Sequence, residues 1–165
     1  MKKTHQKEKL PAGFPLLDDK DIAILQMLQQ NARITVREIS DAIHLSTTPV
    51  HERIKRMEEA GVIRQYATLL NPTQIKRGLT VICYVSLKQH NRTAGARFIK
   101  AIHDMQEVVE CFSISGEFDF MLKVMVENMD AYYDFHVHKL GEAENIGHVQ
   151  SVFVMGIVKQ THRLV

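Results

Sequence analysis

The stretch that most limits how this chain can fold is RITVREISDAIHLSTTPVHERIKRMEEAGVI, because it predicts two short helices with almost no chain between them. Thr35 and Glu38 form the T-x-x-E pattern of a capping box, so one helix is expected to begin there and to end near His44. Ser46 is a suitable N-cap for the next helix, and Gly61 suits the left-handed residue that ends it. Two short helices joined by a tight turn form a helix-turn-helix.

A third helix is predicted immediately upstream, in LDDKDIAILQMLQQN, with Asp18 as its cap. The apolar residues expected to pack between the three helices recur at helical spacing: Ile22, Leu25, Met27 or Leu28, Ile39, Ile43, Val50, Ile54 and Met57. The helix from Ser46 keeps its hydroxyl and charged side chains on the opposite side. Three helices that share a small core and expose the polar face of the last one are typical of a DNA-reading module, whose last helix lies in the major groove.

The side chains expected to contact DNA lie on that last helix and at the start of the preceding one: Arg37, Ser46, Thr47, Thr48, His51, Glu52, Arg53, Lys55 and Arg56. Hydroxyl and basic groups can hydrogen-bond base edges or phosphates. Arg53 leans towards the apolar side of its helix, so it either fixes the DNA backbone or pairs within the fold. The simpler alternative for the whole set is a solvated helix face, and the neighbouring helices favour DNA contact.

The charge distribution supports contact between the first part of the chain and DNA. Residues 1–77 hold 13 Lys and Arg against 9 Asp and Glu, a net charge of +4, whereas residues 78–165 hold 8 against 10, a net charge of −2. Because the positive excess is small, tight binding is expected to need two or more copies on one double-stranded DNA. The leader of residues 1–16 either follows the DNA backbone as a flexible basic arm or is an inert tail, and its lysines are Lys2, Lys3, Lys7 and Lys9.

Composition argues against several other classes of protein. Hydrophobic residues make up 45% of the chain, which is enough for packed cores and argues against wholesale disorder. No run approaches the roughly 18–20 apolar residues of a membrane span, and no apolar segment follows the basic leader as in a signal peptide. We therefore expect a cytoplasmic, nucleoid-associated protein that contacts no membrane. Cys83 and Cys111 lie in apolar strand-like runs and are expected to be buried free thiols.

Beyond Gly61 the pattern changes to alternating strands and helices. Residues 62–78 are expected to form a strand, a turn at Asn71–Pro72 and a linker. From Leu79 the predicted order is strand, helix, two strands joined by a tight turn at Gly116–Glu117, helix and strand, and THRLV can add a further short strand. This βαββαβ order is that of ferredoxin-like domains. The expected fold class is α+β, with a leader (1–16), a three-helix helix-turn-helix domain (17–61), a strand and linker (62–78) and a βαββαβ domain (79–165).

Both helices of the second half are expected to cover the same face of the sheet. The residues predicted to face inward from its last helix are Met129, Tyr133, Val137 and Leu140. The opposite face has no predicted cover, yet its strands remain apolar over 81–85, 121–126 and 152–158. A half-covered apolar sheet predicts at least a homodimer, formed through that face or through strand edges.

The chain resembles the Lrp/AsnC family, the leucine-responsive or feast/famine transcription regulators. The resemblance extends from about residue 17 to the end and rests on STTPVHERIKRMEEAGVI, LLNP, SGEFDFMLKV and VKQTHRLV, which occur in the family's order and spacing. It implies a sequence-specific DNA-binding regulator, a homodimer that assembles further, often to octamers, and a βαββαβ domain that binds a small effector and oligomerises. The effector is usually an amino acid, and a leucine-like one is the first expectation here.

The resemblance also implies that the effector binds between dimers, around the turn in SISGEFDF. Carboxylates at this turn suit an ammonium group, and backbone N–H groups suit a carboxylate. The implied site consists of Ser115, Gly116, Glu117, Phe118, Asp119, Met129 and Val152, the last two as an apolar wall. Spacing alone favours a plain polar hairpin turn, and a core role for Met129 and Val152. Glu117 stands where the closest relatives commonly have aspartate, so its extra methylene bears on effector size or affinity.

An enzyme is the less favoured interpretation. The sequence contains no G-x-S-x-G, P-loop, H-E-x-x-H or paired C-x-x-C motif, so we expect no catalytic residues, no metal ligands and no cofactor. His136 and His138 would point about 200° apart on a helix and cannot share a metal. One alternative is an enzyme similar to siroheme decarboxylases, which share the two-part architecture. A second is an amino-acid sensor that binds no DNA. Neither needs the basic groups of Arg53, Lys55 and Arg56.

Overall fold

The computed structural model describes residues 16–89 and 91–165. It divides them into two compact units: the first runs to Thr68 and also includes Gln160–Val165, and the second spans Leu69–Lys159. The last six residues of the predicted 79–165 segment thus belong to the first unit. The leader lysines, whose role was predicted from charge alone, lie outside the described residues.

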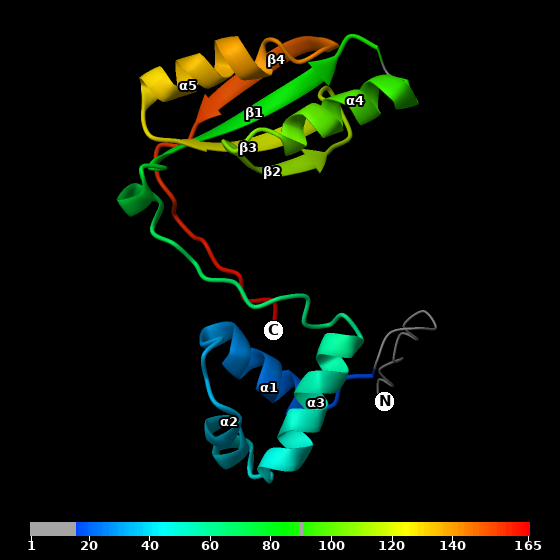
Figure 1. The fold of residues 1–165 in the computed structure, drawn as a ribbon, viewed down its shortest axis with the longest axis vertical. Coiled ribbons are helices and arrows are strands. Elements are labelled where there is room, and N and C mark those ends of the chain that lie inside the picture. Colours follow the sequence, from blue (N-terminus) through cyan, green and yellow to red (C-terminus); the bar gives the residue numbers. More distant parts are fainter. Residues whose placement is uncertain (1–15, 90) are drawn as a thin grey trace, which may run out of the picture. The chain divides into compact units, whose positions relative to one another are not determined.

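Three helices form the body of the first unit: α1 (Asp19–Gln30), α2 (Val36–Ile43) and α3 (Thr47–Glu59) (Figure 1). The predicted caps are confirmed, because Thr35 and Glu38 form a reciprocal capping box and Asp18 forms another at α1. Ser46 occupies the N-cap position of α3, although its hydroxyl accepts no capping hydrogen bond. Gly61 has φ of +70°, a conformation that glycine adopts without steric cost, and the helix ends there.

The core between these helices consists of Ile24, Ile39, Ile43, Val50 and Met57, all buried. Leu25, Met27, Leu28 and Ile54 pack around it as predicted, whereas Ile22 lies outside the cluster. The inward stripe of α1 is instead centred on Ile24 and on Asp21, which is fully buried. The prediction placed only apolar residues on the inward face of α1. Because that face also carries a buried acid, the observed face is turned relative to the predicted one.

The C-terminal segment of the first unit is held by the side chain of Gln29. Its Nε2 donates to the His162 carbonyl at 3.2 Å, and its Oε1 accepts the N–H groups of Leu164 at 3.1 Å and Val165 at 3.2 Å. Both ends of one amide are therefore used on backbone groups. The segment is not a strand, so the additional strand considered for THRLV is not formed.

Replacing Gln29 with alanine is expected to speed hydrogen exchange at the amides of Leu164 and Val165. Each such bond contributes a net of roughly 0.5–1.5 kcal/mol, so the rates should rise roughly two- to tenfold. Gln30→Ala, the same change at the next and exposed position, is the control. Amide exchange followed by NMR measures both variants, and equal rates in the two would show that Gln29 does not hold the segment.

The second unit has the predicted βαββαβ order, which is confirmed. Its elements are η1 (Pro72–Ile75), β1 (Leu79–Leu87), α4 (Arg92–His103), β2 (Val108–Ser113), β3 (Phe120–Val126), α5 (Met129–Phe135), η2 (His136–Leu140) and β4 (Ile146–Phe153). The strands form one antiparallel sheet in the order β2-β3-β1-β4. The architecture is thus α+β, with a helix-turn-helix unit followed by a ferredoxin-like unit.

Residues 62–71 contain no strand, so the strand predicted after Gly61 is wrong for the single chain. A strand needs a hydrogen-bonded neighbour, and within the described residues this segment has none. Its Tyr66 hydroxyl donates to Glu58 at 2.8 Å instead. The predicted turn is confirmed, because the Asn71 side chain accepts the Thr73 N–H at 3.1 Å and Pro72 begins the 3₁₀ helix η1.

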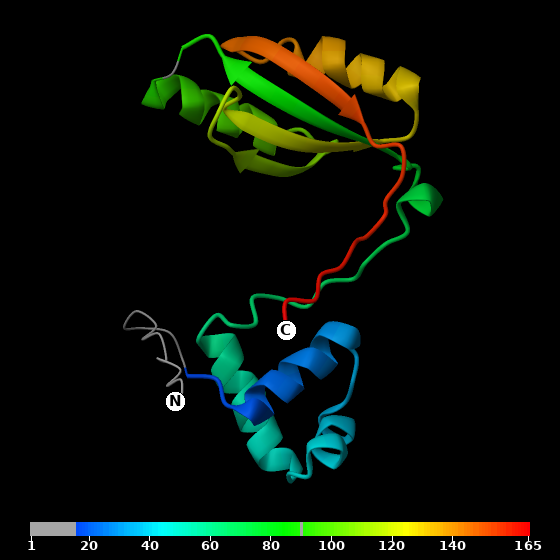
Figure 2. The same cartoon turned by 180° about the vertical axis from the view of Figure 1, so that it is seen from behind.

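Helices α4 and α5 lie on the same face of the sheet (Figure 1; seen from behind in Figure 2). Side chains alternate along β1 and β3, so every second residue is buried beneath the helices. The core residues of this unit are Val81, Cys83, Val85, Leu87, Phe98, Ile102, Phe120, Leu122, Val124, Val126, Tyr132, Phe135 and Leu140. The predicted placement of both helices on one face is confirmed.

The inward face predicted for α5 is wrong in three of its four positions. Met129, Tyr133 and Val137 are 55%, 64% and 37% exposed, whereas Tyr132, Phe135 and Leu140 are buried. The helix widens into the π-helical segment η2, where the Gly141 N–H bonds to the His136 carbonyl at 2.8 Å, five residues back. A π turn adds one residue, which brings Leu140 under the face that Phe135 occupies.

Both cysteines are free. Cys83 is buried as predicted, beside the Tyr132 hydroxyl at 3.3 Å, and burial raises the pKa of its thiol. Cys111 is exposed, contrary to prediction, because β2 is an edge strand of the sheet.

The other face of the sheet, called the open face below, is covered by no helix within the described residues, as predicted. The strand register places on it Thr80, Ile82, Tyr84, Ser86, Glu110, Phe112, Met121, Lys123, Met125, His148, Gln150 and Val152. Half of them are apolar or aromatic, and two charged residues form one ion pair, Lys123 Nζ to Glu110 Oε1 at 2.8 Å.

Candidate functional site

The outward side of α3 carries most of the residues predicted to contact DNA. Those exposed are Ser46, Thr47, Thr48, His51, Glu52, Lys55 and Arg56, together with Arg37 on α2. The opposite side of α3 is fixed by Val50 and Met57, which are 0% and 1% exposed. The sequence folds this way because its apolar residues recur every three or four positions while the first turn holds only hydroxyls and Pro49. One edge of hydroxyl and basic groups therefore stands free at the surface.

Arg53 is the member of the set that the structure places differently. Its side chain is 25% exposed, and its Nη1 lies 2.7 Å from Asp18 Oδ2 and 2.8 Å from Asp21 Oδ1. Of the two roles left open for Arg53, the structure shows the ion pair within the fold. Arg56 also reaches this cluster, with Nη2 2.6 Å from Asp21 Oδ2, but its side chain is 52% exposed.

Two capping acids, Asp18 and Glu38, have lowered pKa values. The pKa of Asp18 is lowered chiefly by the hydrogen bond from the Asp21 N–H and then by Arg53. The pKa of Arg53 is raised, chiefly by its bond to the Asp21 carboxylate and then by that to Asp18. The pKa of Glu38 is lowered because its carboxylate accepts the N–H and hydroxyl of Thr35, both at 2.7 Å. These groups therefore hold the helix-turn-helix unit together best when they are ionised.

Acid is expected to destabilise the first unit, and less so in Glu38→Gln. A carboxyl whose pKa is lowered on folding stabilises the protein above its unfolded pKa, about 4.3 for glutamate. That contribution is lost as the pH falls through the lower pKa of the folded state. Glutamine can keep the capping geometry but does not titrate. Thermal melts between neutral pH and about pH 2.5 should show a smaller fall in Tm for the variant, and parallel curves would contradict this assignment.

The turn between β2 and β3 is closed by backbone hydrogen bonds. The Ile114 N–H bonds to the Asp119 carbonyl at 2.9 Å, and Gly116 has φ of +125°, which favours glycine. The Ser86 hydroxyl donates to the Glu117 carbonyl at 3.2 Å and attaches the turn to β1. Ser115 and Glu117 are exposed at the tip, so their side chains are available to a ligand.

Asp119 anchors this turn to the neighbouring strand. Its Oδ2 accepts the Leu87 N–H at 2.7 Å, and its own N–H donates to the Val85 carbonyl at 2.9 Å. The register of β1 against β4 shifts between Ser86 and Leu87, so the carboxylate satisfies an N–H group at an irregular point of the sheet. Sequence reasoning assigned Asp119 only to the effector, and this bond could not be foreseen without the strand register.

Two rings next to the predicted residue Phe118, those of Tyr84 and His148, were not predicted from the sequence. The Phe118 ring lies 5.4 Å from that of Tyr84 and 6.1 Å from that of His148, measured between centroids. Tyr84 and His148 come from the central strand β1 and the edge strand β4 of the open face. The alternation of side chains along the strands was the only sign in the sequence that Tyr84 and His148 lie on the open face. Their closeness to one another follows from the pairing of β1 with β4.

Met129 and Val152 are not gathered with the turn in one chain. Met129 follows the far end of β3, whose seven residues at about 3.3 Å each separate it by roughly 20 Å from the turn. Val152 pairs with Ile82 on the open face and is 43% exposed. Neither is a core residue of the described chain. A site containing all seven predicted residues would need a second chain.

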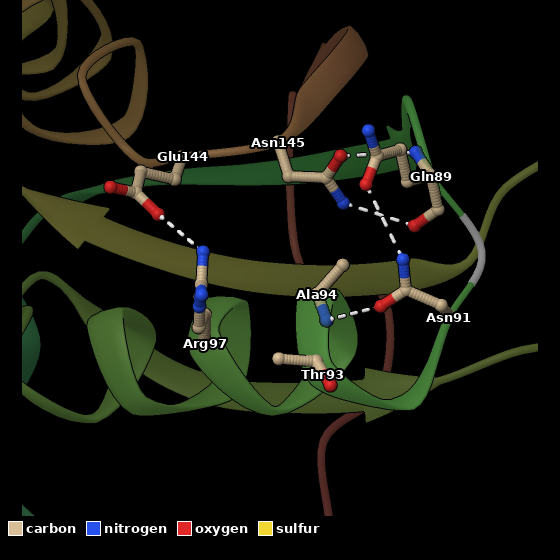
Figure 3. A pocket seen from close by; sticks show the side chains of 7 residues that line it. All are labelled: Gln89, Asn91, Thr93, Ala94, Arg97, Glu144 and Asn145. Carbon is tan, nitrogen blue, oxygen red and sulfur yellow. Dashed lines mark hydrogen bonds and ion pairs between the residues drawn. The ribbon is translucent and has the colours of Figure 1, made fainter.

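A hollow of about 550 Å³ lies where α4 begins, and none of its residues was predicted (Figure 3). It is lined by Gln89, Asn91, Thr93, Ala94, Arg97, Glu144 and Asn145. Its polar groups mostly bond one another: Asn145 exchanges two 3.0 Å bonds with the Gln89 backbone, and Arg97 pairs with Glu144 at 3.4 Å. The network joins the loop before α4 to the start of β4 and serves the fold.

Two kinds of structure are absent from the described part of the chain. Among residues 16–89 and 91–165, no three His, Cys, Asp or Glu side chains are grouped so that they could hold a metal ion. No helix in the same ranges has the length and apolar character needed to cross a membrane.

Known proteins match both units. Residues 80–164 match the family model of the Lrp/AsnC ligand binding domain, and residues 17–64 match a model of winged helix-turn-helix DNA-binding domains. The leucine-responsive regulatory protein of Haemophilus influenzae is 38% identical over 149 residues, which cover 90% of this chain and 90% of that protein. The DNA-binding transcriptional activator DecR of Escherichia coli is 30% identical over 149 residues, which cover 90% and 98%.

Solved structures agree. A transcriptional regulator from Neisseria meningitidis, crystallised as a complex with L-methionine, superposes with a TM-score of 0.87 at 36% identity over 91% of this chain and 97% of that one. An AsnC family transcriptional regulator from Agrobacterium tumefaciens gives 0.85 at 34% identity, over 90% and 97%.

Proposed function

Because the chain belongs to the Lrp/AsnC family of DNA-binding transcriptional regulators with a ligand-binding domain, we propose that it is a sequence-specific regulator controlled by an amino acid. The amino acid changes the assembly of the protein or its affinity for DNA. The observation that supports DNA binding is the exposed polar edge of α3, which lies opposite the buried side of that helix. As a regulator bound to DNA, the protein acts in the cytoplasm, at the nucleoid.

The functional unit we propose is a homodimer that assembles further, up to an octamer. The open face supports this, because an apolar sheet face without a covering layer is stabilised by a second copy. A twofold dimer presents two α3 helices to half-sites about one helical turn of DNA apart, or a multiple of it. The Lys123–Glu110 pair would then be enclosed at the centre of the interface, with its charges already matched.

The effector we propose is an apolar amino acid, such as leucine or methionine, bound between dimers at the β2–β3 turn. The relative crystallised with L-methionine supports this ligand class. Glu117 offers a carboxylate for the ammonium group, the turn offers backbone N–H groups for the carboxylate, and the rings of Phe118 and Tyr84 offer apolar surface. Met129 and Val152 would complete the wall from another chain.

Glu117→Gln is expected to weaken binding of the amino acid at least tenfold, because the ammonium group loses its charged partner, a contact of roughly 1.5–3 kcal/mol. Binding to DNA without the amino acid should stay unchanged, since the turn lies outside the helix-turn-helix unit. Calorimetric titration with leucine and with methionine measures the change. Glu59→Gln, at an exposed position on α3, controls for loss of a surface charge. Wild-type affinity in Glu117→Gln would remove this carboxylate from the site.

A further inference from the structure

Two arginines of α3 converge on one buried acid but differ in exposure. Arg53 touches two carboxylates, those of Asp18 and Asp21, and its side chain is 25% exposed. Among the described residues Arg56 forms an ion pair with Asp21 alone, through Nη2 at 2.6 Å, and its side chain is 52% exposed. Arg53 is therefore held inside the first unit, while half of the Arg56 side chain remains at the surface that carries the other DNA-contacting candidates.

Asp21 is fixed in place by the start of α1. Its side chain is 1% exposed, and its Oδ2 also accepts the Asp18 N–H at 3.1 Å as part of the capping box. A carboxylate near a helix N-terminus is further stabilised by the positive end of the helix dipole. The acid thus has three donors, one from the α1 backbone and two from α3. Its position is set by α1, and it sets in turn where the two guanidinium groups lie.

The single contact of Arg56 matters because a guanidinium group carries five N–H donors in a planar fork. Binding one carboxylate oxygen through Nη2 holds one end of the group in place and leaves its other donors for a further acceptor. A phosphate oxygen accepts such donors with suitable geometry, and an arginine already held in place loses less side-chain entropy when it binds.

We propose that Asp21 is a positioning residue for DNA recognition. It holds Arg53 in an ion pair inside the first unit, and it orients the exposed edge of the Arg56 guanidinium group towards a DNA phosphate. The inference rests on the proposed regulator function. It divides the set predicted from sequence, because Arg56 contacts DNA and Arg53 does not.

Asp21→Asn and Asp19→Asn distinguish positioning from simple charge. Both remove one negative charge from the first turn of α1, and Asp19 is exposed. If charge alone mattered, both would tighten DNA binding. Positioning predicts that Asp19→Asn binds the protein's preferred duplex as tightly as wild type or more tightly, whereas Asp21→Asn binds it about tenfold more weakly. Fluorescence anisotropy titrations measure both affinities, and equal tightening in the two variants would overturn the inference.

A second pair of variants keeps the inference testable if Asp21→Asn does not fold, which a circular dichroism melt reveals. Arg56→Gln should reduce the slope of log K against log salt by about one per protomer, because one phosphate contact is lost. Arg53→Gln should leave that slope unchanged and lower the Tm. Equal losses of slope would contradict the division of roles. Absence of sequence-selective binding in the wild type would instead refute the proposed function itself.

Discussion

Ile82→Glu is expected to convert the protein into a folded monomer that binds its preferred DNA at least a hundredfold more weakly. Ile82 lies on the central strand β1 and on the open face, with Lys123 and Val152 as its cross-strand neighbours. Lys123 is already paired with Glu110, so a second carboxylate beside it leaves one negative charge in the interface without a partner of its own. Such an uncompensated charge costs several kcal/mol, which is enough to dissociate a dimer. A monomer then presents one α3 helix, and the gain from binding two linked half-sites is lost.

Light scattering gives the oligomeric state of Ile82→Glu, and a DNA titration gives its affinity. The matched control is Ile99→Glu, because Ile99 lies on α4 and is 43% exposed. It undergoes the same chemical change outside the open face. The control should keep the wild-type assembly and affinity. A dimeric Ile82→Glu protein would show that the open face is not the interface, and the dimer would have to form elsewhere.

Phe98→Ala is expected to lower the free energy of unfolding by about 3–5 kcal/mol, the range found when a large buried aromatic side chain is removed from a core. Phe98 is 1% exposed, and its ring lies 4.7 Å from that of Phe120 between centroids. It joins α4 to β3, so the substitution removes both buried area and an aromatic contact. The cavity cannot fill without moving a strand that is paired on both sides.

Denaturant unfolding followed by circular dichroism measures this loss. Ile99→Ala, at the adjacent and partly exposed position, should change the free energy by less than about 1 kcal/mol. A loss below that value in Phe98→Ala would mean that α4 does not depend on this contact, and the packing of α4 on the sheet would need another explanation.

The features best predicted from the sequence are those that depend on residues close together in the chain. The capping box of Thr35 and Glu38 involves neighbours in the chain, so its geometry follows from residue types alone. The alternation along β1 and β3 likewise indicated one buried face, and the order of elements then left few topologies. Those features gave the α+β fold and the exposed side of α3.

Sequence failed where a residue acts through a distant partner. Asp21 reads as a surface acid of an amphipathic helix, and only its contacts with Arg53 and Arg56 explain why it is buried. Asp119 reads as a ligand group, and its bond to Leu87 depends on strand register. The π turn over His136–Leu140 places Leu140 on the buried side of Phe135 and not on the exposed side of Tyr133, and no periodicity in the sequence indicated that turn. The seven residues proposed for the effector site could be named only by resemblance, because no pattern in the sequence brings Met129 to the β2–β3 turn.

The most direct test of the proposed regulator is equilibrium binding to a duplex selected from random DNA, measured with and without leucine or methionine. We expect selection to enrich a twofold sequence with half-sites about one helical turn, or a multiple, apart. We also expect at least one of these amino acids to change the affinity by roughly 5- to 150-fold, the usual range for coupled sites. Enrichment of no sequence over random DNA, or an affinity that neither amino acid alters, would contradict it.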